Sequence, residues 1–127
     1  MKLKPLSKLE LEVMEIIWER GECTIRDVTD QVGKTKSLAY TTIATIITRL
    51  IEKGAIKKQD DKFSATYVPT LSKEAMSRTV AQSFLTKFIQ SFGDAAIVSF
   101  AQSVDKLPKK KREQFIELLD VYEKKDK

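Results

Sequence analysis

The chain has 127 residues, of which 42% are hydrophobic and 32% are charged, and these proportions are typical of a folded globular protein. It contains no histidine and one cysteine, Cys23, which excludes a Ser-His-Asp or Cys-His nucleophile and an intramolecular disulfide. Since it also has no phosphate-binding glycine loop and too few thiol or imidazole ligands for zinc, we expect no metal, no cofactor and no enzymatic activity, although catalysis by carboxylates alone stays open.

The first predicted helix follows Ser7 and runs to about Arg20. Ser7 and Glu10 have the spacing of a capping box, in which each side chain accepts a hydrogen bond from the other residue's backbone N–H, and Gly21 suits the end of the helix. Four residues at helical spacing form one apolar face: Leu11, Met14, Ile17 and Trp18.

The second predicted helix follows Thr24, an N-cap residue with Asp27 three positions later, and it stops at Gly33. Its inward side chains are Ile25, Val28 and Val32. Cys23 immediately precedes the helix cap. We interpret it as a small apolar residue under the helix start and not as a redox group.

A short polar linker, residues 33–37, leads to a third helix over about residues 38–53, which ends at Gly54. Its apolar residues recur at helical spacing: Ile43, Ile46, Ile47, Leu50 and Ile51. The opposite face carries mostly small and polar side chains: Thr41, Ala44, Thr45, Thr48, Arg49 and Glu52. Threonine is unfavourable on an exposed helix surface, but its hydroxyl and methyl groups suit contacts with the DNA backbone and with thymine.

A β-hairpin is predicted next, from residues 55–58 and 63–68 around a turn at residues 59–62. Phe63, Ala65 and Tyr67 alternate with polar residues, which is typical of a half-buried strand. Two helices, a short turn and a following hairpin are the order of a winged helix-turn-helix. The predicted fold is therefore mostly α with a small β-hairpin, with a winged helix-turn-helix domain over residues 1–71 and a helical dimerisation domain over residues 72–127.

Basic side chains cluster around the third helix. Residues 34–62 contain seven basic and three acidic side chains, whereas residues 1–33 contain five basic and seven acidic ones. Such clustering suits a surface that faces phosphates, and the N-terminal part of the second helix of the pair contacts base edges in the major groove. Any single lysine could equally be a solvated surface residue. The candidate DNA-binding residues are Lys34, Lys36, Tyr40, Thr41, Thr42, Ala44, Thr45, Arg49, Lys57, Lys58 and Lys62.

Three helices are predicted in the C-terminal part: one from the cap Ser72 to about Phe92, a short one over about residues 95–103 capped by Asp94, and a last one beginning near Pro108. A unit this small rarely stabilises itself without a partner, so we expect a homodimer. The alternative is that its apolar stripes pack back onto the N-terminal domain. The candidate dimerisation residues are Met76, Val80, Phe84, Phe88, Phe92, Phe100, Phe115 and Leu119.

Two segments carry a resemblance to a known family. Residues 39–54 (AYTTIATIITRLIEKG) resemble the recognition helix of the penicillinase-repressor (BlaI/MecI/CopY) family, and residues 9–18 (LELEVMEIIW) resemble its first helix. The resemblance extends over residues 6 to about 70. It implies a winged-helix dimer that represses an operon by occupying an inverted-repeat operator, with the C-terminal domain holding the dimer. The positions that it places on the DNA-binding helix are Thr41, Thr42, Thr45 and Arg49.

The chain departs from this family at two points. Copper-sensing members end in a cysteine cluster, which this sequence lacks. In members that respond to β-lactams, a membrane sensor triggers cleavage of an Asn-Phe bond, and the matching bond here is Ser99-Phe100. The resemblance therefore implies a candidate cleavage bond in a sensor-protease pathway, with serine in place of asparagine.

Two other functions stay open on the sequence: a winged-helix module for protein association without operator binding, and a ligand-sensing repressor, for which the sequence shows no pocket. No apolar run is long enough to span a bilayer, and no apolar segment follows the basic N-terminus as in a secretory signal. A single cysteine fits a reducing compartment. We expect a cytoplasmic protein without membrane insertion.

Overall fold

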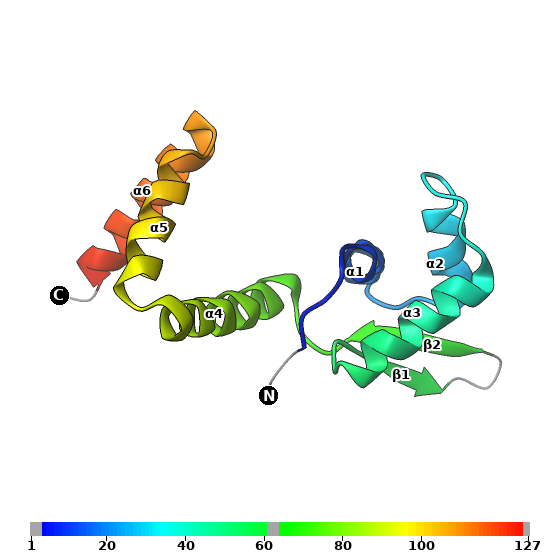
Figure 1. Cartoon of the computed structure of the whole chain (residues 1–127). Coiled ribbons are helices and arrows are strands. Elements are labelled where there is room, and N and C mark those ends of the chain that lie inside the picture. The colour runs from blue at the N-terminus through cyan, green and yellow to red at the C-terminus, as the bar shows by residue number, and fades with distance from the viewer. Residues whose placement is uncertain (1–3, 61–63, 126–127) are drawn as a thin grey trace. The chain divides into compact units, whose positions relative to one another are not determined.

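The computed structural model describes residues 4–60 and 64–125. Within them the elements follow in the order α1 (Lys8–Arg20), α2 (Ile25–Val32), α3 (Tyr40–Glu52), β1 (Ile56–Asp60), β2 (Ala65–Pro69), α4 (Lys73–Phe92), α5 (Asp94–Asp105) and α6 (Lys109–Lys125) (Figure 1). This order confirms the predicted fold class, mostly helical with a small hairpin after the third helix.

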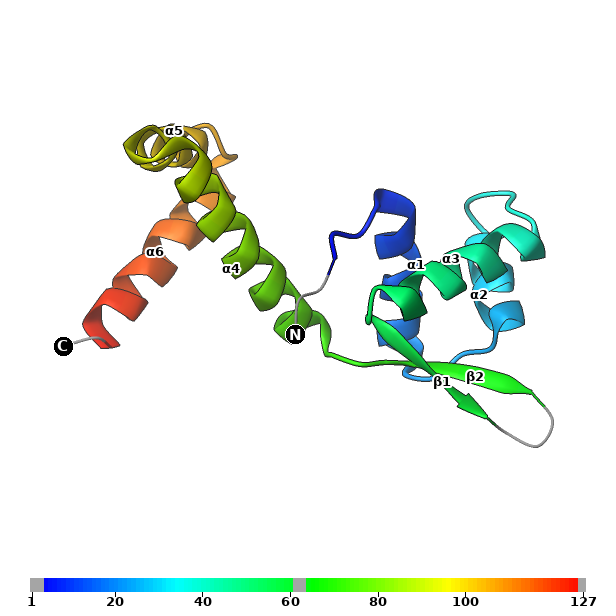
Figure 2. The same cartoon turned by 60° about the horizontal axis from the view of Figure 1, so that its bottom comes forward.

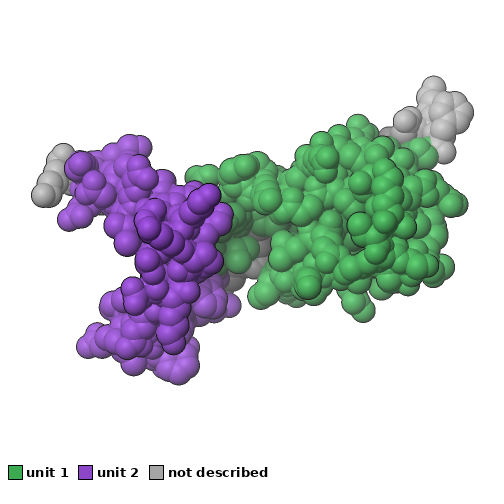
Figure 3. Space-filling view, turned by 90° about the horizontal axis from the view of Figure 1, so that it is seen from above, with its two compact units in different colours: residues 1–81 green, residues 82–127 purple. Residues whose placement is uncertain are grey.

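The chain divides into two compact units, residues 1–81 and residues 82–127 (Figure 3). Unit 1 contains α1 to β2 and the first part of α4, and unit 2 contains the rest of α4 with α5 and α6. The division lies inside α4, whereas the sequence pattern places the domain boundary before this helix. The first turns of α4 therefore take part in the packing of unit 1.

The helix starts in unit 1 follow from local hydrogen bonds. In the capping box of α1, the Glu10 amide donates to Ser7 Oγ at 3.2 Å and the Ser7 amide donates to Glu10 Oε1 at 2.8 Å. Thr24 and Asp27 form the same arrangement at α2, with both distances 3.0 Å. Gly21 ends α1 with a φ of +81°, which favours glycine. These features confirm the predicted helix caps.

The core of unit 1 is formed by the apolar faces of its helices together with the base of the hairpin. The inward residues of α3 recur at helical spacing, as predicted, and α3 packs against α1 and α2. These inward residues are Ile43, Ile46, Ile47 and Leu50. The buried core residues are Val13, Met14, Ile17, Cys23, Val28, Val32, Ile43, Ile46, Ile47, Leu50, Ala55, Ile56, Tyr67 and Met76. One contiguous core thus holds the helix-turn-helix, the hairpin and the start of α4.

Backbone pairing on both sides of β2 fixes the hairpin against the helices (Figure 2). Strand β2 pairs antiparallel with β1, with Tyr67 opposite Lys58. Tyr67 also pairs with Cys23 in the α1–α2 loop: the Cys23 amide donates to the Tyr67 carbonyl at 3.1 Å, and the Tyr67 amide donates to the Cys23 carbonyl at 2.8 Å. Burial raises the pKa of the Cys23 thiol, which supports its interpretation as a core residue.

Several element boundaries differ from the prediction. Helix α3 begins at Tyr40 and not at residue 38, because Ala39 is extended and is the N-cap residue. Strand β1 continues to Asp60, through residues predicted to form the turn, and β2 begins at Ala65. Asp94 lies in the first turn of α5, because Gly93, with a φ of +61°, precedes the helix as its cap. Phe63 and Lys62 lie outside the described residues.

Three apolar side chains do not lie where their helical spacing predicts. Leu11 and Ile51 are exposed, since they stand at the edges of the stripes that α1 and α3 bury. Met76, a predicted dimerisation residue, is only 3% exposed and belongs to the core of unit 1. It packs there because the first turns of α4 belong to that unit.

A buried ion pair joins the start of α1 to the end of α3. Glu10 is 3% exposed, and Lys53 Nζ donates to its Oε1 at 2.6 Å and to the Pro5 carbonyl at 3.0 Å. Burial alone would raise the pKa of Glu10, but hydrogen bonds from Lys53 and Ser7 outweigh it and hold the pKa below its usual value. The second oxygen of Glu10, Oε2, has no hydrogen-bond partner among the described residues. Compensation of the buried negative charge therefore depends on Lys53.

Replacing Lys53 by methionine should destabilise the protein because it leaves a buried carboxylate without its cation. We expect the free energy of unfolding to fall by about 1–3 kcal/mol in urea titrations at neutral pH. Lys36→Met is the matched control: it removes the exposed pair with Glu12, at 2.9 Å, and should cost less than about 1 kcal/mol. Equal losses in the two variants would contradict the role given to the buried pair.

The same pair predicts a pH dependence. Because the folded pKa of Glu10 is lowered, its contribution to stability is present above the usual value of 4.5 and is lost as the pH falls through the folded pKa. The stability difference between the parent and Lys53→Met should therefore shrink below pH 4.5.

Candidate DNA interface

Helix α3 presents a polar face to solvent because its apolar face is in the core. Ile43, Ile47 and Leu50 are fully buried on one side. The exposed side carries the predicted contact residues Tyr40, Thr41, Thr42, Thr45 and Arg49, with Ala44 partly exposed beside them. The hairpin packs next to α3, as Figures 1 and 2 show. The structure thus brings the predicted α3 residues together on one surface.

The threonine hydroxyls of this face bond within the helix. Thr45 Oγ1 donates to the Thr41 carbonyl at 3.0 Å, and Thr48 Oγ1 donates to the Ala44 carbonyl at 3.0 Å. Such bonds to the preceding turn use the hydroxyl proton, so the oxygen is left as an acceptor and the methyl group as an apolar contact. A thymine methyl or an adenine or cytosine amino group is the matching partner in the major groove.

The predicted basic residues beside this face differ in whether the structure describes them and in whether they are already paired. Lys34 precedes α3, and Lys57 and Lys58 lie on β1; all three are exposed. Lys36 is engaged by Glu12 in an exposed ion pair, which a phosphate could replace at small cost. Lys62, the remaining predicted lysine, lies outside the described residues.

Sequence reasoning missed Arg26. Its guanidinium carbon lies 5.2 Å from the centre of the Tyr40 ring, so α2 contributes a cation to the start of α3. Arg26 lies in residues 1–33, where acidic side chains outnumber basic ones, so the clustering of basic residues did not indicate it as a candidate. Its position beside the helix cap Thr24, where a cation opposes the helix dipole, was the available signal.

Unit 2 exposes most of its large apolar side chains. Of its described residues, Ala96 alone is buried, and Phe84 and Phe92 are 62% and 63% exposed. The Phe84 and Phe88 rings stack at 5.7 Å, the Phe88 and Phe92 rings meet edge-on at 5.5 Å, and the Phe100 and Phe115 rings are tilted at 6.0 Å. Leu119 and Ser99 are exposed too, as is Val80 in the part of α4 that belongs to unit 1.

The helix pair α2–α3, its short turn and the adjoining hairpin define a winged helix-turn-helix protein. Residues 6–121 match the family model described as penicillinase repressor. The chain belongs to the penicillinase repressor family. Among the described residues, no helix is long and apolar enough to cross a bilayer.

Individual relatives agree with this assignment. A penicillinase repressor of Bacillus licheniformis is 25% identical over 126 residues, which is 99% of this chain and 98% of that protein. The transcriptional regulator BlaI of Mycobacterium tuberculosis is 30% identical over 105 residues, 81% of this chain and 76% of that protein. The monomeric form of Bacillus licheniformis BlaI, solved in complex with the blaP half-operator, has a TM-score of 0.51 and 32% identity over 57% of this chain and 89% of that chain.

Substitutions on α3 and on β1 should have different effects on DNA binding. Thr45→Ala should relax base preference at one position, at a cost of about 1–3 kcal/mol for the preferred base, as expected for the loss of a groove contact. Lys57→Ala should weaken binding to all sequences alike, with a salt slope reduced by about 1, as expected for the loss of a phosphate contact. Selection on randomised DNA measures both effects. The same change in base preference for the two variants would refute the assignment of α3 to the groove.

Proposed function

We propose that this protein is a transcriptional repressor that binds an inverted-repeat operator as a homodimer, with α3 of each protomer in the major groove of one half-site. The observation that carries the proposal is the exposed polar face of α3 beside a basic hairpin, in a chain of the penicillinase repressor family. The relative BlaI, solved with its half-operator, supports DNA as the ligand of this surface.

The geometry of α3 supports contacts of two kinds. Tyr40, Thr41, Ala44 and Thr45 lie in its first two turns, where a recognition helix contacts base edges. Arg49 lies one turn further along, within reach of the phosphate backbone that borders the groove. Lysines before α3 and on β1 add phosphate contacts on either side, and these fix the position of the helix without specifying sequence.

Unit 2 supports the dimer. Phenylalanines and aliphatic residues are exposed on all three of its helices, and exposed apolar side chains that lie together mark interaction surfaces. A second copy of the same unit would cover them, in the two-fold arrangement that is commonest among homo-oligomers. The residues we assign to this interface are Phe84, Phe88, Phe92, Phe100, Phe115 and Leu119 of unit 2, together with Val80 in the part of α4 that belongs to unit 1.

Relief of repression by proteolysis would act through the same unit. The candidate cleavage bond, Ser99-Phe100, lies inside α5, so a protease needs local unwinding of this helix to reach it. Cleavage would detach the end of α5 and all of α6, and with them Phe100, Phe115 and Leu119. The winged helix would be left intact, but each protomer would hold a single half-site. A membrane sensor-protease pathway is the source of such cleavage that the family resemblance implies.

Operator binding is tested by selecting bound genomic fragments and footprinting them. We expect two symmetric protected half-sites centred about 10 base pairs, or a multiple of that, apart. With six to ten phosphate contacts, affinity should fall by about 10³ to 10⁵ between 50 and 200 mM salt. Absence of a selected sequence together with a flat salt response would contradict the proposal and favour a protein-association module.

A chain that ends at Ser99 tests the dimer and the effect of cleavage together. In sedimentation, the full chain should be a dimer at micromolar concentration and the truncated chain a monomer. Operator affinity should fall by about 10² to 10⁴, because the linked second half-site is lost, while affinity for a single half-site stays the same. The control is a chain without residues 126–127. A truncated chain that dimerises like the parent would rule out the assignment of Phe100, Phe115 and Leu119 to the interface and the proposed effect of cleavage.

A further inference from the structure

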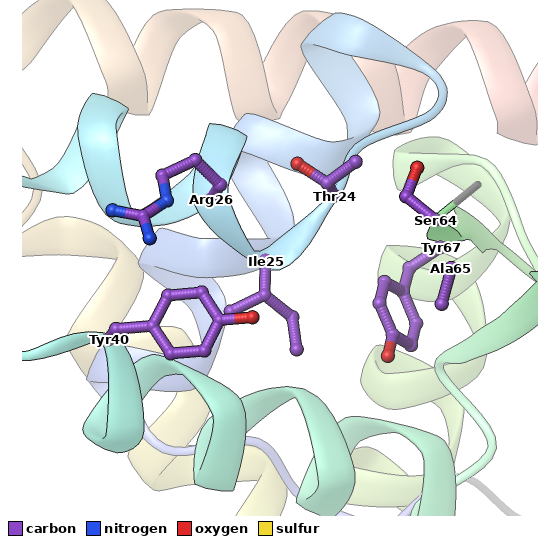
Figure 4. Close-up of a pocket in the computed structure, with 7 residues that line it drawn as sticks. All are labelled: Thr24, Ile25, Arg26, Tyr40, Ser64, Ala65 and Tyr67. Carbon is purple, nitrogen blue, oxygen red and sulfur yellow. The ribbon is translucent and has the colours of Figure 1, made fainter.

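A pocket lies between the helix-turn-helix and the hairpin (Figure 4). Its volume is about 460 Å³, within the range of about 300–1,000 Å³ that small-molecule sites occupy. Residues 24–26 at the start of α2 line it, with Tyr40 at the start of α3 and Ser64, Ala65 and Tyr67 at β2. The pocket therefore lies beside the start of α3, which belongs to the candidate DNA interface.

Among the described residues that line the pocket, one is a cation and none is a carboxylate. The guanidinium of Arg26 lies over the Tyr40 ring, 5.2 Å from its centre, and in this position it can still donate through its edge to a carboxylate in a bidentate contact. Thr24 and Ser64 add hydroxyl groups to the lining (Figure 4). This charge balance favours an anionic ligand.

The remaining lining is apolar and aromatic. Figure 4 shows the rings of Tyr40 and Tyr67 on opposite sides of the pocket, with Ile25 between them. Tyr67 is 7% exposed and is held by backbone bonds to Cys23, so this wall is rigid. Two tyrosine rings and an isoleucine suit a flat apolar body, and stacked or edge-on contacts favour an aromatic one.

We propose that this pocket binds a small aromatic carboxylate, with the ring against Ile25, Tyr40 and Tyr67 and the carboxylate on Arg26. Bound there, the ligand opposes operator binding. It occupies the start of α3, and its negative charge lies where DNA phosphates approach. This second part rests on the proposed function, whereas occupancy of the pocket does not.

Direct binding is tested without DNA, by NMR titration of the full chain with benzoate. We expect saturable shifts of the lining residues, and affinities at least about tenfold weaker for benzamide, which lacks the charge, and for cyclohexanecarboxylate, which lacks the aromatic ring. Arg26→Gln should weaken benzoate binding at least about tenfold. Arg78→Gln on α4, which removes the same charge outside the pocket, should bind benzoate like the parent. Absence of saturable shifts, or equal affinity of Arg26→Gln and the parent, overturns the proposal.

Ser64→Trp provides a steric test, since it fills the pocket from an exposed position without changing charge. This variant should lose benzoate binding, and retention would overturn the proposal. In the second arm, saturating benzoate should weaken operator binding by about fivefold or more in the parent and leave Ser64→Trp unaffected. An unchanged parent would overturn the antagonism with DNA. If no operator is bound at all, the proposed function fails while the titration still decides the pocket.

Discussion

The packing of one apolar stripe of α3 into the core is the constraint on which the rest of unit 1 depends. Burial of Ile43, Ile46, Ile47 and Leu50 is worth about 1.5–3 kcal/mol for each side chain, which together is comparable to the whole stability of a small domain. A helix held so firmly on one side cannot rotate. The threonine face is therefore fixed outward, and the propensity cost of exposed threonines is acceptable because tertiary packing, and not local preference, determines the helix.

The two units differ in how completely they bury their apolar surface. Unit 1 has one contiguous core, closed by the pairing of Cys23 with Tyr67, which sets the position of the hairpin beside α3. Of its described residues, unit 2 buries Ala96 alone and leaves Phe84, Phe92 and Phe100 exposed. The proposed function therefore assigns recognition and assembly to different parts of the chain. On that proposal, loss of the dimer interface would leave the DNA-binding surface folded.

The sequence predicted those features that arise from neighbouring residues or from regular spacing. Both capping boxes and the apolar stripe of α3 are of this kind. The features it missed depend on contacts between distant residues. Glu10 is buried because Lys53, 43 residues further along the chain, compensates its charge, and Arg26 joins the candidate interface through the ring of Tyr40. The pocket was missed for the same reason, since its walls come from α2, α3 and β2. The observed ends of the hairpin strands differ from the predicted ones. Backbone pairing between distant residues, and not the alternation of polar and apolar side chains, decides where a strand stops.

The proposed function places the solvent-exposed face of α3 in the major groove. Cross-linking tests this placement with a photoreactive benzophenone side chain at Thr45, irradiated in the protein bound to its selected operator. We expect cross-links to bases within each half-site, and none from the same side chain placed at Glu74 on α4. Cross-links from Glu74 to the half-site bases, with none from Thr45, would contradict it.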